Sequence, residues 1–267
     1  MKVEYLISTM YKSDYKFIND MNINSDATII NQTDFYKKQE YETNRGKIKF
    51  ISTTDRGLSK SRNLAIKNAS GDICVLCDDD IKHYDNSVEV IKKAYLENSE
   101  ADIIVFAYHT KGRHKKNFTQ KSSKINYLSA MKISSVQITF KRKSILEKGI
   151  LFNEQFGTGS SVYQSGEENI FLFECLKKGL KIYYEPQYIL QLEENGESSW
   201  FRGFNEKYML DRGAIFTAMS KKFSLALILQ FAIRRYNLYK NSMGLFMAIK
   251  YMLNGRKRYL SIGKKNK

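Results

Sequence analysis

An apolar run followed at once by three aspartates constrains most strongly how this chain folds. Residues 73–77 are all apolar over the length of one strand, which is typical of a strand buried on both faces of a sheet. Asp78, Asp79 and Asp80 come next. In open parallel sheets, ligands bind beyond the carboxyl ends of the strands, and this cluster falls at that place. Carboxylate oxygens suit Mg²⁺ or Mn²⁺, which would in turn hold a diphosphate. The alternative is a solvated acidic turn or a helix cap.

Strand-like and helix-like segments alternate along the first 200 residues. The expected strands cover residues 2–9, 26–31, 48–52, 73–77, 101–107, 136–141 and 180–185, and the expected helices 14–21, 59–68, 86–97 and 170–178. Ser59 is expected to cap the second of these helices, which ends at Gly71. The alternation predicts an α/β fold with a doubly wound, mostly parallel sheet.

The last quarter of the chain is basic and helical in pattern. Residues 201–267 contain 15 Lys and Arg against two acidic residues, a net charge of +13 out of +16 for the whole chain. Amphipathic helices of this kind can lie on an anionic membrane surface. Alternatively, their apolar stripes pack on the rest of the protein and the charges are only solvated. We therefore expect two parts, an α/β domain over residues 1–200 and a basic helical extension over residues 201–267.

Cysteines and apolar stretches indicate a cytoplasmic protein. Cys74, Cys77 and Cys175 are too few for a disulfide framework, and the first two lie in the apolar run, where we expect buried residues rather than zinc ligands. The N-terminus has no long apolar signal region, and residues 223–233 are too short to span a bilayer.

Two sequence blocks resemble the glycosyltransferase family 2. Residues 57–81 read GLSKSRNLAIKNASGDICVLCDDDI, which is similar to the family signature G-x-S-x-x-R-N-x-x-I-x-x-A-x-G-D followed by an apolar strand that ends in D-x-D. Residues 152–186 read FNEQFGTGSSVYQSGEENIFLFECLKKGLKIYYEP and resemble the acceptor-side block. With the first strands, the resemblance covers roughly residues 1–200 and implies a GT-A fold, a nucleotide-sugar donor and inverting, metal-dependent transfer of the hexosyltransferase type.

The resemblance also implies roles for the aspartates. Asp78 and Asp80 occupy the D-x-D positions, which place the ribose and the metal–diphosphate group. Mn²⁺ or Mg²⁺ is therefore expected on Asp80 and Asp78, with Asp79 in the same nucleotide-binding cluster. Relatives often carry a further histidine ligand, but residues 188–193 contain none. Either Gln191 or Glu193 replaces it, or the metal rests on aspartates and phosphates alone.

Other residues are expected to contact the nucleoside. By resemblance, Thr9 and Tyr11 pack against it and Arg62 lies near the base, unless Arg62 is only an exposed arginine at a helix start. Many relatives end the second strand with Asp-Asp-Gly-Ser, whereas this chain has residues 31–34, Asn-Gln-Thr-Asp. Gln32 can accept a hydrogen bond from N3–H of uracil and donate one to an oxygen, or it is only a polar strand end. Thymine presents the same edge, so UDP and dTDP donors both remain open.

Glu167 and Glu168 stand just before an expected helix, where negative charge is favourable in itself. In similar enzymes the second acidic residue is the general base, so Glu168 is expected to deprotonate the acceptor hydroxyl and Glu167 to orient the acceptor or loop. An α-linked donor would then give a β-glycoside. The basic loop of residues 109–116 either contacts an acidic acceptor or lipid phosphate or is simply solvated.

The sequence also suggests two other functions, and its residues argue against both. The charge of +16 suggests a nucleic-acid-binding protein, but the basic residues avoid the expected sheet and no recognition motif is present. A nucleotidyltransferase normally needs a glycine-rich loop after the first strand, and residues 8–14 contain no glycine.

The expected partners are therefore a nucleotide-sugar donor, a glycan or lipid-linked saccharide acceptor and the anionic inner face of the cell membrane, but no nucleic acid. A composition rich in Lys, Asn, Ile and Tyr with one proline suggests an AT-rich bacterial genome, with a role in capsule, exopolysaccharide or cell-wall glycan synthesis. The sugar, the acceptor, the linkage and the oligomeric state stay open.

Overall fold

The structure is a computed structural model, and it describes residues 1–111, 118–193, 201 and 203–265. Its described strands form one sheet in the order β3-β4-β2-β1-β5-β9-β7-β10-β6, with β8 beside β10. The strands are β1 (Val3–Met10), β2 (Asp26–Gln32), β3 (Lys37–Thr43), β4 (Gly46–Thr53), β5 (Ile73–Asp78), β6 (Ile81–His83), β7 (Ile103–Lys111), β8 (Ser123–Lys124), β9 (Ile138–Lys141) and β10 (Ile182–Glu193).

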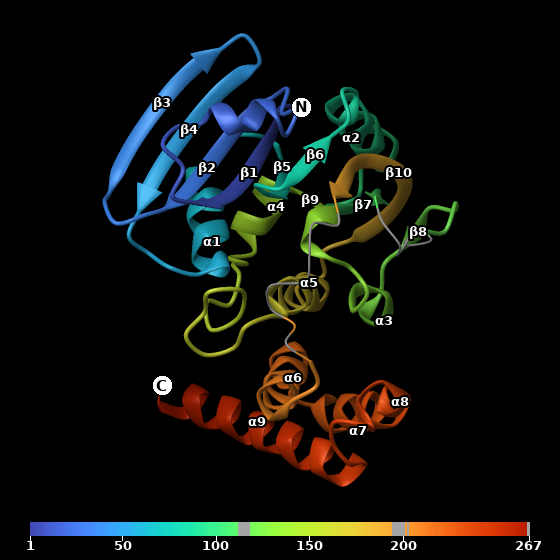
Figure 1. Cartoon of the computed structure of the whole chain (residues 1–267). Helices are drawn as coiled ribbons and strands as arrows, with labels where there is room; N and C mark the ends of the chain where they lie inside the picture. The colour runs from blue at the N-terminus through green and yellow to red at the C-terminus, as the bar shows by residue number, and fades with distance from the viewer. Residues whose placement is uncertain (112–117, 194–200, 202, 266–267) are drawn as a thin grey trace.

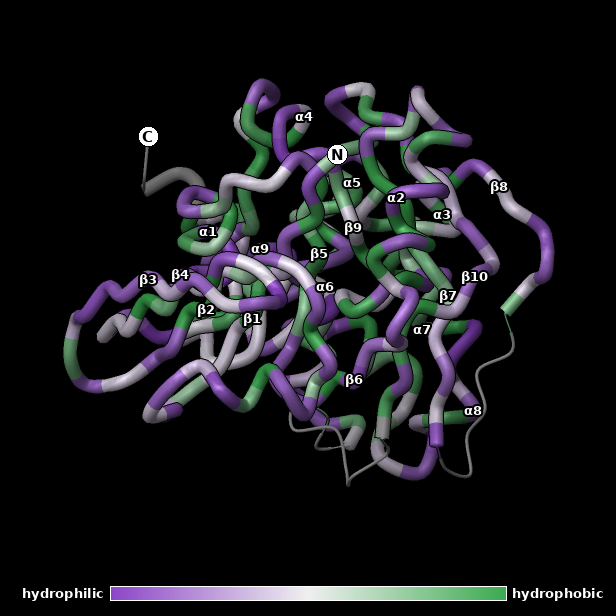
Figure 2. The backbone as a smooth tube through the Cα atoms, turned by 90° about the horizontal axis from the view of Figure 1, so that it is seen from above, coloured by the Kyte–Doolittle hydropathy of each residue, from purple (hydrophilic) through white to green (hydrophobic). Residues whose placement is uncertain are grey.

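The pairing of the strands confirms a mixed α/β fold with a mostly parallel centre. Strand β1 runs parallel to both β2 and β5, and β2–β4 and β7–β10 are also parallel. Strand β9 is antiparallel to both of its neighbours, β5 and β7. The three strands not expected from the sequence are β3, β6 and β8. Strand β3 reads KKQEYET and is drawn mostly in the hydrophilic colour at the edge of the sheet (Figure 2), so it carries no apolar run that would reveal it.

The helices are α1 (Leu58–Asn68), α2 (Ser87–Glu97), α3 (Tyr127–Ala130), α4 (Arg142–Glu147), α5 (Glu167–Lys177), α6 (Glu206–Met219), α7 (Ser224–Arg234), α8 (Tyr236–Tyr239) and α9 (Leu245–Lys265), with 3-10 turns η1 (Lys16–Asn19) and η2 (Ser135–Gln137). Two expectations were wrong. Residues 14–21 form only the turn η1, and Gly57 rather than Ser59 stands at the N-cap of α1. The Ser59 hydroxyl instead donates to the carbonyl of Phe156, 2.6 Å away, which fastens α1 to a distant loop.

A hydrophobic core covers each face of the sheet. Because side chains alternate along a strand, Leu6 of β1 belongs to one core cluster and Tyr5 and Ile7 to the other. The cluster that contains Leu6 continues into the C-terminal helices through Ile215 and Met252. The three cysteines are buried and free, and burial was expected for Cys74 and Cys77.

Helices α6 to α9 form a layer below the sheet, and α5 lies between this layer and the sheet (Figure 1). The layer depends on a close crossing of α6 and α9. A Cβ atom added at Gly213 would stand 1.8 Å from the carbonyl oxygen of Met252, and one added at Gly255 would stand 1.9 Å from that of Leu210. Only glycine allows two helix backbones to approach this closely. The amphipathic segments therefore pack on one another and on the α/β domain.

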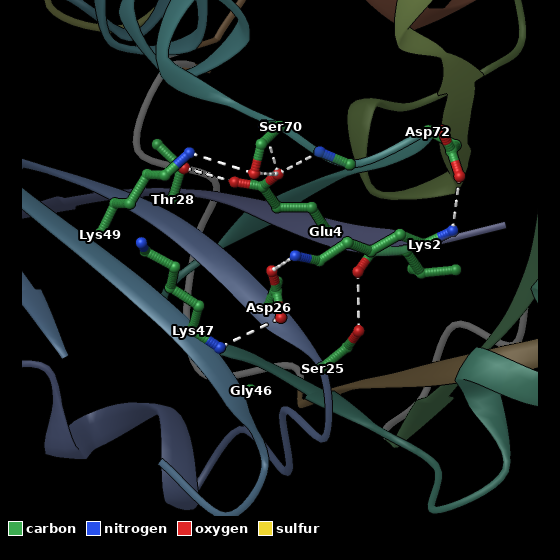
Figure 3. Close-up of polar contacts among 12 residues, drawn as sticks. Lys2, Glu4, Ser25, Asp26, Thr28, Gly46, Lys47, Lys49, Ser70 and Asp72 are labelled. Atoms are coloured by element: carbon green, nitrogen blue, oxygen red, sulfur yellow. Dashed lines mark hydrogen bonds and ion pairs between the residues drawn. The ribbon is translucent and has the colours of Figure 1, made fainter. Parts of the chain in front are cut away.

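A polar cluster secures the opposite end of the sheet, at the amino ends of β1 and β2 (Figure 3). The buried Glu4 carboxylate accepts hydrogen bonds from the Thr28 hydroxyl at 2.6 Å and from the backbone N–H groups of Ser70 and Gly71 at 2.6 and 2.5 Å. Because a buried carboxylate needs such partners, these bonds hold the turn before β5 against β1.

Candidate active site

A pocket of about 420 Å³ opens beyond the carboxyl ends of β1, β2 and β5. It is lined by Ser8, Thr9, Met10, Gln32, Arg56, Gly57, Leu58, Asp78, Asp79, Asp80, Thr158 and Gly159. The parallel strands bring these ends to one edge of the sheet, because residue Ser8 of β1 lies beside Asp78 of β5 and Met10 beside Gln32 of β2. The pocket therefore unites the expected residues Thr9, Gln32 and all three aspartates.

The three aspartates have different partners. Asp78 ends β5 and lies 3.1 Å from the Arg62 guanidinium. Asp79 accepts a hydrogen bond of 2.5 Å from the Thr9 hydroxyl and lies 3.6 Å from the Lys12 ammonium. Asp80 is exposed, and its partial desolvation together with the Asp78 charge raises the pKa of its carboxyl. A cation near this pocket would relieve that repulsion.

The side chains present fit a divalent cation only in part. In the described part of the chain, no group of three or more His, Cys, Asp and Glu side chains is arranged to hold a metal. Asp80 and Asp78 supply carboxylate oxygens, so a cation here would need diphosphate oxygens to complete its ligands. Gln191 lies in β10 opposite Lys82 of β6, and the Glu193 side chain is outside the described residues. Metal dependence therefore stays a prediction.

Gln32 is held by the backbone at the start of α1. Its side-chain carbonyl accepts a 2.8 Å hydrogen bond from the N–H of Gly57, and Gly57 has φ = 116°, a backbone conformation that favours glycine. A carbonyl oxygen has two lone pairs, so Gln32 keeps one for a further N–H donor. The proposed contact with a pyrimidine edge is compatible with this arrangement.

Tyr11 and Arg56 form the rim of the pocket region. Tyr11 is exposed and has φ = 53°, an unusual conformation for a bulky residue that often marks a functional loop. The Arg56 guanidinium stands 5.6 Å from the Tyr11 ring and bonds Asp34 at 2.6 Å and the carbonyl of Thr33 at 2.8 Å. Sequence reasoning missed Arg56 and Lys12, although both are basic residues adjacent to expected site segments.

Arg62 is buried, which excludes an exposed arginine at a helix start. Its guanidinium joins two carboxylates, Asp78 at 3.1 Å and Glu167 at 3.0 Å. A planar, permanently charged fork suits this bridging contact. Arg62 therefore connects the aspartate cluster to the acidic pair at the start of α5.

Glu168 lies in the first turn of α5, beside the buried Glu167. Burial and the Glu167 charge raise the pKa of Glu168 to about 8, while the charges of Arg62 and Arg212 act in the opposite direction. Carboxyl groups with raised pKa values are typical of general acids and bases. Arg212 belongs to α6, and a Cβ atom at Gly166, the N-cap of α5, would meet Ile215 of α6 at 2.8 Å. The C-terminal layer thus reaches this acidic pair.

Helix α9 also supports a wall of the pocket. The N–H of Leu58 donates to the carbonyl of Thr158 at 2.9 Å, so the loop that carries Thr158 closes against α1. The Tyr259 ring of α9 packs 5.6 Å from the Phe156 ring in the same loop, and Asn153 donates to its hydroxyl at 3.5 Å. The amphipathic pattern of the extension did not reveal this contact.

The fold and the site define the class of protein: a GT-A-type glycosyltransferase structure, with a mostly parallel sheet and an aspartate cluster at its carboxyl edge. Residues 34–161 match the family described as glycosyl transferase family 2. The family resemblance found in the sequence is thereby confirmed over residues 34–161.

Solved structures of one bacterial protein have the same fold. Residues 1–349 of S. aureus TarS in complex with UDP-GlcNAc superpose with a TM-score of 0.66 at 14% identity, over 96% of this chain and 79% of that one. The complex of the same TarS fragment with UDP has a TM-score of 0.64 at 14% identity, over 96% and 81%. At this identity the likeness shows the fold. No curated protein matches the chain.

Two remaining expectations concern surfaces. Within the described residues, none of the helices combines the length and the apolar character that crossing a bilayer requires. Most of the basic loop of residues 109–116 lies outside the described residues, so its expected contact is left as a prediction.

Proposed function

We propose that this protein is an inverting glycosyltransferase that moves a sugar from a UDP- or dTDP-sugar to a hydroxyl of a glycan or lipid-linked acceptor. The observation that carries the proposal is the Arg62 bridge. It holds Asp78, at the mouth of the pocket, and Glu167, beside the candidate base Glu168, on one guanidinium. A donor site and a proton acceptor therefore stand next to each other.

On the donor side, residues in and beside the pocket bind the nucleotide. Tyr11 and Thr9 flank the nucleoside, and Gln32 meets the pyrimidine edge with its remaining lone pair and its amide N–H groups. Lys12, 3.6 Å from Asp79, adds positive charge close to the diphosphate. The TarS complexes with UDP-GlcNAc and UDP support a uridine nucleotide as the first donor to test.

On the acceptor side, Glu168 takes the proton of the acceptor hydroxyl while the oxygen of that hydroxyl bonds to the anomeric carbon of the donor sugar. The bond from that carbon to the diphosphate oxygen breaks, and its electron pair leaves with the nucleotide. A divalent cation on Asp80 and Asp78 would neutralise the negative charge of the diphosphate. Glu167, fixed by Arg62, positions the loop and the start of α5.

Calorimetric titration with UDP, dTDP, GDP and CMP tests the donor site without knowledge of the acceptor. We expect UDP or dTDP to bind in the presence of Mn²⁺, and excess EDTA to weaken that binding. If the folded protein binds none of the four nucleotides, the donor assignment is wrong. If binding is unchanged by EDTA, the metal assignment is wrong while the nucleotide site stands.

We also propose peripheral contact with the anionic inner face of a bacterial membrane, in the assembly of a surface glycan. Leu225, Leu229 and Ile233 are 49%, 49% and 67% exposed at successive turns of α7, beside a chain segment of charge +13. Exposed apolar residues next to basic ones suit an anionic bilayer.

Vesicle flotation tests this contact. The protein is expected to float with phosphatidylglycerol vesicles and not with phosphatidylcholine vesicles, and the Leu225→Ser/Leu229→Ser/Ile233→Ser variant should remain in solution. The control is Leu96→Ser on α2, since Leu96 is 71% exposed. Equal flotation of the triple variant and the wild type would contradict the proposal.

A further inference from the structure

A second pocket lies away from the donor site, between the segment around α3 and helices α6, α7 and α8. Its volume of about 550 Å³ exceeds the about 420 Å³ of the donor pocket. In Figure 1, α3 lies above α7 and α8 on the right-hand side of the molecule. None of the proposed donor residues lines it.

The walls of this pocket carry positive charge. Lys132, Arg212, Arg234 and Arg235 line it, and no Asp or Glu is among the lining residues. Within the described parts of the chain, no carboxylate lies within ion-pair distance of any of the three arginines, and the Nε of Arg212 is buried without a hydrogen-bond partner. A buried N–H group without a partner is costly, so these groups favour an anionic ligand.

The remaining surface of the pocket is apolar. Phe204 of the segment before α6, Leu227 of α7 and Leu238 of α8 contribute to it. Leu238 is 57% exposed although it belongs to a pocket wall. A small inorganic anion would leave this surface in water, whereas a phosphate attached to a hydrocarbon chain would cover it. Charge and wall together therefore match an amphiphilic phosphate.

The pocket is linked to the candidate base through Arg212. This residue lines the pocket, and three positions further along α6 the Ile215 side chain lies against Gly166, which immediately precedes Glu167 and Glu168. A phosphate held on Arg212 would therefore keep the group attached to its other side close to Glu168. Planar guanidinium groups are well suited to bind phosphate oxygens in pairs.

We propose that this pocket binds the phosphate of a lipid-linked saccharide acceptor, with the hydrocarbon chain against the apolar wall and the sugar hydroxyl directed toward Glu168. The inference rests on the proposed glycosyltransferase function and names the acceptor class. Arg234, Arg235 and the exposed apolar stripe of α7 then serve one purpose, since the lipid of the acceptor and the membrane reach the same helix.

Calorimetric titration with octyl phosphate, kept below its micelle concentration, tests the site on the full chain. We expect octyl phosphate to bind more tightly than either inorganic phosphate or octyl glucoside, which lack the chain and the charge respectively. The Arg234→Ala/Arg235→Ala variant should weaken octyl phosphate about tenfold or more, as expected for lost charged hydrogen bonds. Lys240→Ala, which removes an exposed charge outside the pocket, should leave it unchanged.

Leu238→Ser separates a lipid from a free phosphate. It should weaken octyl phosphate and leave inorganic phosphate unaffected. The proposal is overturned if inorganic phosphate or octyl glucoside binds as tightly as octyl phosphate. It is also overturned if the Arg234→Ala/Arg235→Ala variant binds octyl phosphate with unchanged affinity. UDP binding is measured on the same samples, so a protein that binds UDP but no octyl phosphate loses the acceptor inference and keeps the proposed function.

Discussion

The Arg62 guanidinium lies 3.0 Å from the Glu167 carboxylate, across 105 positions of sequence. With the contact to Asp78 on its other nitrogen, it ties the start of α1, the end of β5 and the start of α5 into one buried unit. Because both the donor pocket and the candidate base border this unit, its integrity bears on binding and on chemistry.

Arg62→Ala is therefore expected to lower the free energy of unfolding by about 3–5 kcal/mol, since it leaves carboxylates near the core without their cation. Arg62→Lys keeps the charge but not the fork, and should fall between the wild type and the alanine variant. Urea denaturation measures both. A loss of less than 1 kcal/mol in Arg62→Ala, close to the about 0.5 kcal/mol typical of ordinary surface changes, would show that the bridge is dispensable.

Glu168→Gln should lower turnover by about 10²–10⁴-fold, the range for loss of a general base, while UDP still binds. In the wild type, kcat/KM should increase with pH toward about 8, since the pKa of Glu168 is raised to about 8 and only the carboxylate accepts a proton. A pH profile of transfer measures this. Lost UDP binding in Glu168→Gln would argue for a structural role.

The same carboxyl should affect stability with the opposite sign. Because the folded protein holds this proton above the ordinary pKa of 4.5, the native state binds more protons than the unfolded state between pH 4.5 and about 8. Stability contributed by Glu168 therefore falls as pH rises through this interval. Thermal unfolding of the wild type relative to Glu168→Gln should show the decline, and a difference that does not change with pH would contradict it.

Asp80→Asn should remove the dependence of UDP binding on Mn²⁺, so that titrations with Mn²⁺ and with EDTA give similar dissociation constants and turnover is lost. The reason is that Asp80 is exposed and that the negative charges of Asp78 and Asp79 disfavour its ionised form. A cation bound to Asp80 would offset this repulsion. Asp20→Asn, an exposed aspartate on another segment, is the matched control. Full activity in Asp80→Asn would refute the metal assignment.

Gly213→Ala should destabilise the fold by about 1–3 kcal/mol or more, since the added methyl group overpacks the crossing of α6 and α9 at 1.8 Å from the Met252 carbonyl oxygen. Gly255→Ala should act alike. Gly244→Ala, whose added carbon meets nothing within 4 Å, is the control. Differential scanning fluorimetry compares the three. Equal melting temperatures would mean that the crossing is looser than described.

Local pattern was sufficient for much of this protein. The apolar run before Asp78 predicted a buried central strand, and the two sequence blocks predicted the family that residues 34–161 match. Hydrophobic periodicity and motif spacing are short-range properties, so a single sequence carries them. The missed strand β3 shows the limit of that signal, because a sheet-edge strand whose one apolar side chain is Tyr41 has no apolar pattern to read.

What only the tertiary structure decided are the contacts between distant segments. The Arg62 guanidinium bridges Asp78 and Glu167, a pair of contacts that the sequence did not predict. The helices of the extension place Ile215 against Gly166, just before the acidic pair, and Tyr259 against the pocket loop. These relationships depend on how α6 and α9 cross and how α5 meets the sheet. The packing of whole helices and strands determines these contacts, and the spacing of residues along the chain does not encode that packing.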